Sequence, residues 1–212
     1  MKHLLFLLIA AGTLHISAFS QSDRYMGAMA GTLHEFAAAS DGASMAAVAA
    51  KFERIGDAEK TQWLPYYYAA LTKARMSMQG MGGDKDAMAN EAETLINKAQ
   101  AIQKNSENYC VVYMIASARM LVDPQSRYMT YMAPMTEALD QAKKLDPSNP
   151  RPYALLAIAF RNTPEQFGGG CKAAKPDADK ALSLYASFQP ASPISPNWGK
   201  DIVDGVVNGC KL

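Results

Sequence analysis

The sequence is poor in the side chains on which catalysis and metal binding most often depend. It contains three histidines and three cysteines in 212 residues. His3 and His15 lie in an N-terminal segment typical of an export signal, so any Ser-His or Cys-His catalytic arrangement would have to use His34. His34 lies in a stretch of helical periodicity, where a structural histidine is the expected interpretation. The cysteines lack the close paired spacing of zinc sites. The sequence therefore predicts no catalytic residue, no metal, no cofactor and no enzyme.

Long apolar runs are also missing once the first twenty residues are set aside. Residues 1–20 begin with a positive charge at Lys2, continue through an apolar run from Leu4 to Gly12, and end in the small-x-small sequence Ala18-Phe19-Ser20. That apolar run is about half as long as the roughly 20 residues that a membrane-spanning helix needs. We therefore expect a signal peptide at residues 1–20, a single mature domain at residues 21–212, and a protein that is secreted or periplasmic.

Neither sign of charge dominates the mature chain. Without Lys2, 20 basic residues face 20 acidic ones, and no basic run is present. Nucleic acids and anionic membranes attract proteins with a basic surplus. The balance of charge therefore argues against both as partners, and no transmembrane segment is expected after removal of the signal.

The alternating pattern of β-strands is absent as well, and helical periodicity extends over almost the whole chain. Glycine, proline and asparagine clusters divide the pattern into eight or nine segments. We expect an N-terminal helix pair between Arg24 and Gly56 and a C-terminal capping helix between Trp198 and Cys210. Between them, helices starting near Trp63, Ser106 and Pro150 would each be the first member of a pair.

An internal repeat supports this arrangement. Three predicted second helices carry apolar residues at the same four-three-three spacing, and each copy is displaced by 43 residues from the one before. The three stripes are Ala92, Ile96, Ala99 and Ile102; Met135, Leu139, Ala142 and Leu145; and Ala178, Leu182, Tyr185 and Phe188. Equal spacing of amphipathic helices predicts an all-α, right-handed stack of antiparallel helix pairs with about three repeats.

One junction between helices resembles a known repeat family. The stretch from Leu145 to Ala157, with its aspartate-proline stop and its aromatic, leucine and small-residue run, is similar to the junction between two tetratricopeptide (TPR) repeats. The segments at Phe52–Ile55, Trp63–Tyr68, Thr163–Gly170 and Pro196–Gly199 resemble uncharacterised exported TPR-like proteins of Bacteroidetes. The resemblance implies a TPR-like α-solenoid, although the period of 43 departs from the 34 residues of that family.

The resemblance also implies a groove lined by residues of the first helices that lie off the packing stripe. Arg75 and Arg119 are one period apart, and arginine forks recognise carboxylates. Because three adjacent tyrosines, Tyr66 to Tyr68, point about 100° apart in a helix, we expect at least one of them to be exposed. The hypothesis is a groove for an acidic group, and the alternative is a solvated arginine face. The predicted groove residues are Tyr67, Arg75, Arg119, Arg151, Arg161 and Asn162.

The cysteines allow one disulfide, but the sequence does not establish it. Cys110 lies in an apolar stretch and is interpreted as a small buried hydrophobic residue. Cys171, in a glycine-rich loop, and Cys210, near the C-terminus, are the plausible pair in an exported protein. Whether the two are bonded depends on a geometry that the sequence does not contain.

The functional expectation that follows is binding without catalysis. The main prediction is a peptide- or protein-binding scaffold or adaptor of the bacterial cell envelope. The alternative is a periplasmic small-molecule carrier associated with a transporter. A hydrolase using Glu or Asp is a remote third reading, because the i, i+2 spacing of pairs such as Glu91 and Glu93 places their carboxylates on divergent faces.

Overall fold

The computed structural model describes residues 14–211, and the side chains of residues 23–211. Within that range the chain forms α helices, one short 3-10 helix (η1, Glu165–Phe167) and no β-strand. The α helices are α1 (Leu14–Ala38), α2 (Gly42–Ala58), α3 (Trp63–Gln79), α4 (Lys85–Ile102), α5 (Ser106–Met120), α6 (Pro124–Leu145), α7 (Arg151–Asn162), α8 (Cys171–Tyr185) and α9 (Lys200–Cys210). Residues 1–13 of the predicted signal peptide lie outside the described residues, and residues 14–20 belong to α1.

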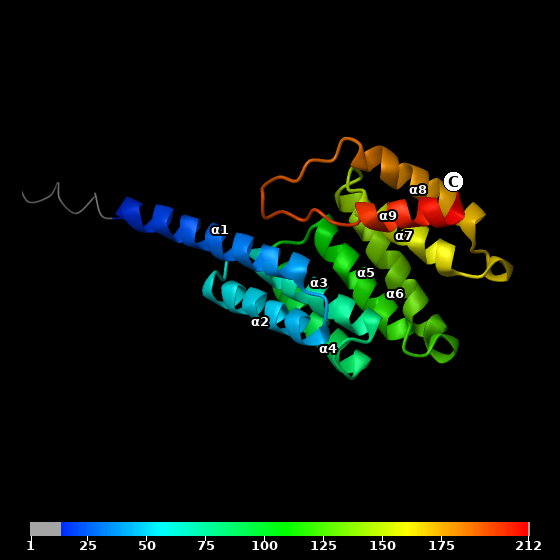
Figure 1. Ribbon diagram of the computed structural model, residues 1–212, viewed down its shortest axis with the longest axis horizontal. Coiled ribbons are helices and arrows are strands. Elements are labelled where there is room, and N and C mark those ends of the chain that lie inside the picture. The colour runs from blue at the N-terminus through cyan, green and yellow to red at the C-terminus, as the bar shows by residue number, and fades with distance from the viewer. Residues whose placement is uncertain (1–13, 212) are drawn as a thin grey trace, which may run out of the picture.

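The helices pack as neighbours in chain order (Figure 1). The most extensive contacts join α3 to α4, α5 to α6, α2 to α3 and α7 to α8, and α9 packs against both α7 and α8. Short connections make the members of each pair antiparallel. The prediction of an all-helical chain built from helix pairs is confirmed, and the expected helix starts at Trp63 and Ser106 agree with the structure.

The repeated apolar stripe provides the packing face of the second helices. Its first three positions are buried in α4 (Ala92, Ile96, Ala99) and in α6 (Met135, Leu139, Ala142). In α8 only the first position, Ala178, is buried, and Leu182 and Tyr185 are partly exposed. Alanine dominates these positions, and its small side chain allows the paired helices to approach closely. Aspartate or asparagine side chains accept hydrogen bonds from the first turns of α4, α5 and α6, which fixes where these helices begin.

Helix α3 is enclosed by its neighbours. It contacts α2, α4 and α5, and Ile194 covers another side of it. As a result Tyr66, Tyr67 and Tyr68 are all buried. The expectation that at least one of these tyrosines is exposed was wrong, because it assumed a helix with one free face.

The C-terminal part of the chain forms a second, smaller core. Small side chains of α7 and α8 meet Val203 and Val206 of α9, and a disulfide joins Cys171 at the start of α8 to Cys210 at the end of α9. The sequence favoured this pairing, and the third cysteine, Cys110, is buried and free. Residues 186–199, called the strap below, run from α8 back across α3 before α9 begins (Figure 1).

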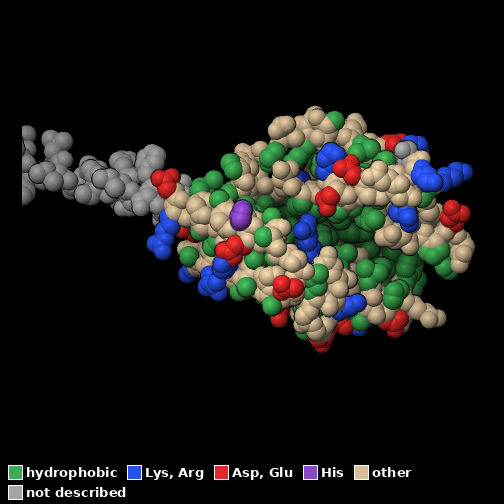
Figure 2. All heavy atoms as spheres, viewed as in Figure 1, with side chains coloured by type: hydrophobic (Ala, Val, Ile, Leu, Met, Phe, Trp, Pro, Cys, Tyr) green, Lys and Arg blue, Asp and Glu red, His purple; other side chains and the backbone are tan. Residues whose placement is uncertain are grey.

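The face of the molecule seen in Figure 2 shows no large area of one charge. In Figure 2, basic and acidic side chains are interspersed over the visible face. Within the described part of the chain, no helix combines the length and apolarity that crossing a membrane requires.

The close approach of α2 to α3 yields a stability prediction. A Cβ added at the buried Gly56 would lie 2.8 Å from a ring carbon of Tyr66, and the Tyr66 hydroxyl is held by a 2.8 Å hydrogen bond to Asp57. We therefore expect Gly56→Ala to lower the free energy of unfolding by about 1–3 kcal/mol in urea denaturation. The matched control is Gly205→Ala in α9, where an added Cβ meets open space and should raise stability by up to about 1 kcal/mol. Equal stabilities of the two variants would contradict the close packing.

Candidate functional site

Three of the predicted groove residues meet under the end of the strap. Tyr67 and Arg75 come from α3, and Arg151 opens α7. Trp198 of the strap lies among them, with its ring centroid 5.6 Å from the guanidinium carbon of Arg75 and 5.4 Å from that of Arg151. The sequence placed these residues on an open groove, whereas the structure gathers them beneath a covering segment.

A buried ion pair stands at the centre of this cluster. Arg151 is 0% exposed, and its Nη1 donates to Oε1 of Glu107 at 2.8 Å while its Nη2 donates to the carbonyl of Pro196 at 2.6 Å. The hydroxyl of Tyr67 donates to Oε2 of Glu107 at 3.2 Å and accepts from Nε1 of Trp198 at 2.6 Å. The network joins α3, α5, α7 and the strap.

The charges of the cluster are paired within the chain, although Nε of Arg151 is buried without a hydrogen-bond partner among the described residues. Burial raises the pKa of Glu107, against the lowering effects of Arg151 and of hydrogen bonds from Tyr67 and Asn149. Burial is the largest effect on the pKa of Arg151 and lowers it, but Glu107 and the weaker effects of Tyr67, Tyr185 and Cys110 together outweigh burial, and the net direction is upward. The arginine fork that we expected to bind an external carboxylate is thus directed at a carboxylate of the chain itself.

The other predicted groove residues lie elsewhere. Arg119 donates to Glu93 and to Asn90, both at 2.7 Å, on the outer side of the α4–α5 contact. Arg161 lies against Gly209 of α9. Asn162 is exposed at the end of α7. The structure therefore does not bring the six residues together in one groove.

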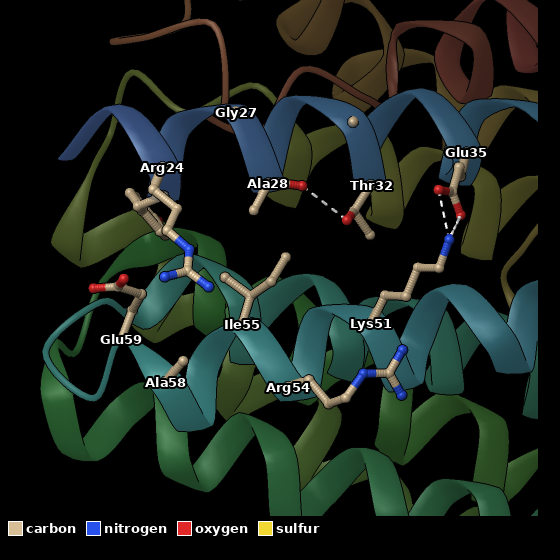
Figure 3. A pocket seen from close by; sticks show the side chains of 12 residues that line it. Arg24, Gly27, Ala28, Thr32, Glu35, Lys51, Arg54, Ile55, Ala58 and Glu59 are labelled. Atoms are coloured by element: carbon tan, nitrogen blue, oxygen red, sulfur yellow. Dashed lines mark hydrogen bonds and ion pairs between the residues drawn. The ribbon is translucent and has the colours of Figure 1, made fainter. Parts of the chain in front are cut away.

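A cleft that sequence reasoning missed lies between α1 and α2 (Figure 3). It has a volume of about 920 Å³ and is bounded by α1 from Arg24 to Glu35 and by α2 and its C-cap from Lys51 to Glu59. Small-molecule sites in proteins are typically about 300–1,000 Å³ in volume. The cleft is thus large enough for a sizeable organic ligand.

The walls of the cleft are smooth and largely apolar. Gly27 and Gly31 lie one turn apart on α1, with Ala28 beside them, and a Cβ added at either glycine would meet no atom within 4 Å. Ile55 and Ala58 provide the apolar surface of α2. Because glycine removes side-chain bulk from a helix face, the chain leaves room here instead of closing the two helices together.

Charged groups stand at the ends of the cleft. At one end Lys51 of α2 donates to Glu35 of α1 at 2.6 Å, so that this pair bridges the two helices (Figure 3). At the other end Arg24 reaches from α1 toward α2. Neither Arg24 nor Arg54, also on the lining, has an ion-pair partner among the residues that the structure describes. The cleft therefore combines apolar walls with two cationic side chains that are available to an acidic group.

Tyr25 and Thr32 are the buried residues of the lining that carry a hydroxyl, and Thr32 donates to the Ala28 carbonyl at 2.8 Å. Tyr25 is 8% exposed, and its hydroxyl has no hydrogen-bond partner among the described residues. Burial, with a further contribution from the Glu59 carboxylate, raises the pKa of Tyr25 to about 12. The side chain is consequently a neutral phenol at physiological pH and a potential donor.

The cleft holds none of the usual soft or imidazole ligands. No histidine, cysteine or methionine contributes to its lining, and His34 is exposed on α1 outside it. Among the described residues there is no group of three or more His, Cys, Asp or Glu side chains that could hold a metal ion. The signal that could have located the cleft was the pair Gly27 and Gly31, four residues apart in a helix.

Comparison with solved structures gives one extensive match. The HusA haemophore from Porphyromonas gingivalis is 33% identical in sequence to this chain, with a TM-score of 0.77. The match covers 88% of this chain and 92% of the haemophore. No protein-family model matches the chain, and no curated protein matches it either.

The main functional prediction from the sequence, a peptide- or protein-binding adaptor, is contradicted by this match. A haemophore is a carrier of a small molecule, and the likeness extends over nearly the whole of both chains. The structure also closes the cluster of Tyr67, Arg75 and Arg151 beneath the strap, which removes the open arginine surface on which the adaptor prediction drew. The alternative, a small-molecule carrier, is the better supported of the two.

The buried ion pair yields a second stability prediction. Removing one partner of a buried pair leaves an uncompensated charge and typically costs about 3–5 kcal/mol. We expect Arg151→Ala to lower the free energy of unfolding by this amount in urea denaturation, because Glu107 would remain buried. Arg119→Ala is the control, since its partner Glu93 is half exposed and such pairs contribute about 1 kcal/mol or less. A cost for Arg151→Ala no larger than that of the control would contradict the anchoring role of the pair.

Proposed function

Since the chain belongs to the family of the HusA haemophore, we propose that it binds haem and acts as a carrier of it. The observation that carries the proposal is the 33% identity over 92% of the haemophore, with a TM-score of 0.77. At this level of likeness the two chains share their fold. Haem is the cargo in this proposal, and no reaction is assigned to the protein.

We assign the cargo to the cleft between α1 and α2, on grounds of complementarity. Haem is a flat apolar macrocycle with two propionate carboxylates on one edge. The apolar walls at Gly27, Gly31 and Ile55 suit the macrocycle, and Arg24 and Arg54 suit the propionates through charge-assisted hydrogen bonds. The volume of about 920 Å³ lies within the range of ligand sites that enclose molecules of this size.

The remaining sequence-based expectations belong to the same proposal. The chain is a non-enzymatic protein that is exported by the segment at residues 1–20 and is secreted or periplasmic. Its helix pairs form a right-handed TPR-like stack. The 43-residue spacing of the apolar stripes in α4, α6 and α8 and the predominance of contacts between consecutive helices support that architecture.

The direct test is a haem titration of the protein from residue 21 onward. We expect a saturable shift of the haem absorption band in the visible spectrum and a single haem per chain in native mass spectrometry. Absence of any saturable spectral change, with a folded protein confirmed by circular dichroism, would contradict haem binding.

A substitution that fills the cleft tests the location. We expect Gly31→Leu to weaken haem binding at least about tenfold, because a side chain in the open space at Gly31 would occupy the cleft and forfeit the burial of ligand surface. Leucine also favours helix over glycine, so the melting temperature should not fall. Gly205→Leu in α9 is the matched control, as another helical glycine with open space around its Cβ position, and it should bind as the unaltered protein does. Equal affinities of the two variants would place the haem outside this cleft.

A further inference from the structure

The Tyr25 hydroxyl is exceptional among the tyrosines of this chain. The hydroxyls of Tyr66, Tyr67, Tyr68 and Tyr185 each donate a hydrogen bond, to Asp57, Glu107, the Ile194 carbonyl and the Trp198 carbonyl respectively. Only 8% of the surface of Tyr25 is exposed, yet its hydroxyl has no hydrogen-bond partner among the described residues. Leaving a buried donor unsatisfied costs about 1–3 kcal/mol, and native proteins rarely accept that cost without a reason.

The surroundings of this hydroxyl indicate the kind of partner that it lacks. Tyr25 lies on the lining of the α1–α2 cleft, where Arg24, Lys51 and Arg54 are also found. Lys51 is engaged with Glu35, and the Glu59 carboxylate also lines the cleft, so the three basic and two acidic side chains leave a surplus of one positive charge. A neutral phenol donates, and an acceptor that is itself anionic gains from both the phenol and the arginines. A carboxylate satisfies all three groups.

We propose that the Tyr25 hydroxyl donates a hydrogen bond to a carboxylate of the ligand in the α1–α2 cleft and so fixes how the ligand is oriented there. This inference rests on the proposed function, because it takes the ligand to be haem and the carboxylate to be a propionate. Tyr25 is in this sense a specificity-determining residue, which favours an acidic ligand over a neutral one of the same shape.

Direct coordination of the iron by Tyr25 is the competing role for the same side chain. Coordination needs the phenolate, and both burial and the Glu59 carboxylate raise the pKa of Tyr25, so they favour the neutral donor. The two roles differ in which part of the ligand feels the loss of the hydroxyl. If Tyr25 donates to a propionate, its contribution to affinity depends on a free carboxylate. If Tyr25 binds the iron, its contribution does not depend on the carboxylate.

The experiment is a thermodynamic cycle with two proteins and two ligands. The proteins are the unaltered chain and Tyr25→Phe, and the ligands are haem and haem dimethyl ester, in which both carboxylates are masked. We expect Tyr25→Phe to weaken haem binding on the order of tenfold, the value typical of a hydrogen bond to a charged group, and to leave binding of the ester within about twofold. Tyr128→Phe, at a half-exposed tyrosine of α6 away from the cleft, should alter neither affinity.

Stability provides an independent readout. Because the Tyr25 hydroxyl has no partner among the residues that the structure describes, Tyr25→Phe removes no hydrogen bond seen there and should leave the melting temperature unchanged or raise it. A purely structural tyrosine would show the reverse, with a lower melting temperature and unchanged affinity, and that result would overturn the proposal.

The failures of the two proposals are distinguishable. If the unaltered protein binds no haem, the proposed function fails. If it binds haem and Tyr25→Phe binds equally well, the function stands and the role of Tyr25 is wrong. An equal loss of affinity for haem and for the ester, or the loss of a tyrosinate-to-iron absorption band, would also overturn the proposal in favour of contact with the macrocycle or the iron.

Discussion

The buried pairing of Arg151 with Glu107 is the constraint on which the arrangement of the whole molecule depends. A guanidinium with no exposed surface must find its partners inside the protein, and here Glu107 and Pro196 come from two separate parts of the chain. Glu107 brings α5, the carbonyl of Pro196 brings the strap, and Arg151 itself brings α7. Tyr67 and Trp198 extend the same network to α3. The larger N-terminal core and the smaller C-terminal core are therefore held in register by polar groups, where apolar contact alone would specify their relative position less well.

The N-terminal helix pair, α1 and α2, is packed less closely than the centre of the molecule around α3. In the centre of the molecule every face of α3 is covered, and aromatic rings stack on one another, as Phe52 does on Tyr68 with centroids 5.2 Å apart. Between α1 and α2, glycines take the place of the alanines and isoleucines that close the other pairs, and the helices stand apart over part of their length. The closely packed part of the chain thus provides a rigid support, and the part with less internal contact provides the cleft that we propose as the ligand site.

Sequence periodicity was sufficient to predict the class of fold but not the site. The stripes of α4, α6 and α8 depend on neighbours one to four residues apart, and the caps at Asp84, Asn105 and Asp123 act within three residues, so both are legible in the sequence. The burial of Arg151 depends on Pro196 and Trp198, which follow some 45 residues later, and no local pattern shows that the strap returns to cover it. The exposure of one α3 tyrosine was wrongly predicted for the same reason, because contacts distant in sequence bury all three. The α1–α2 cleft was not predicted because it arises from the absence of side chains at Gly27 and Gly31, whereas the predicted groove was built from charged side chains of later helices.

The disulfide between Cys171 and Cys210 has a consequence for how the protein tolerates damage. It closes a covalent ring of which the strap is one arc, since residues 186–199 lie between the two half-cystines. A protease that cut the strap would break one bond of that ring without releasing either piece. The nicked protein would remain one disulfide-linked molecule under non-reducing conditions. Helix α9 would stay packed against α7 and α8, and Trp198 would keep its hydrogen bond to the Tyr67 hydroxyl. In surroundings rich in peptidases, the polypeptide would be cleaved at the strap before the fold was lost.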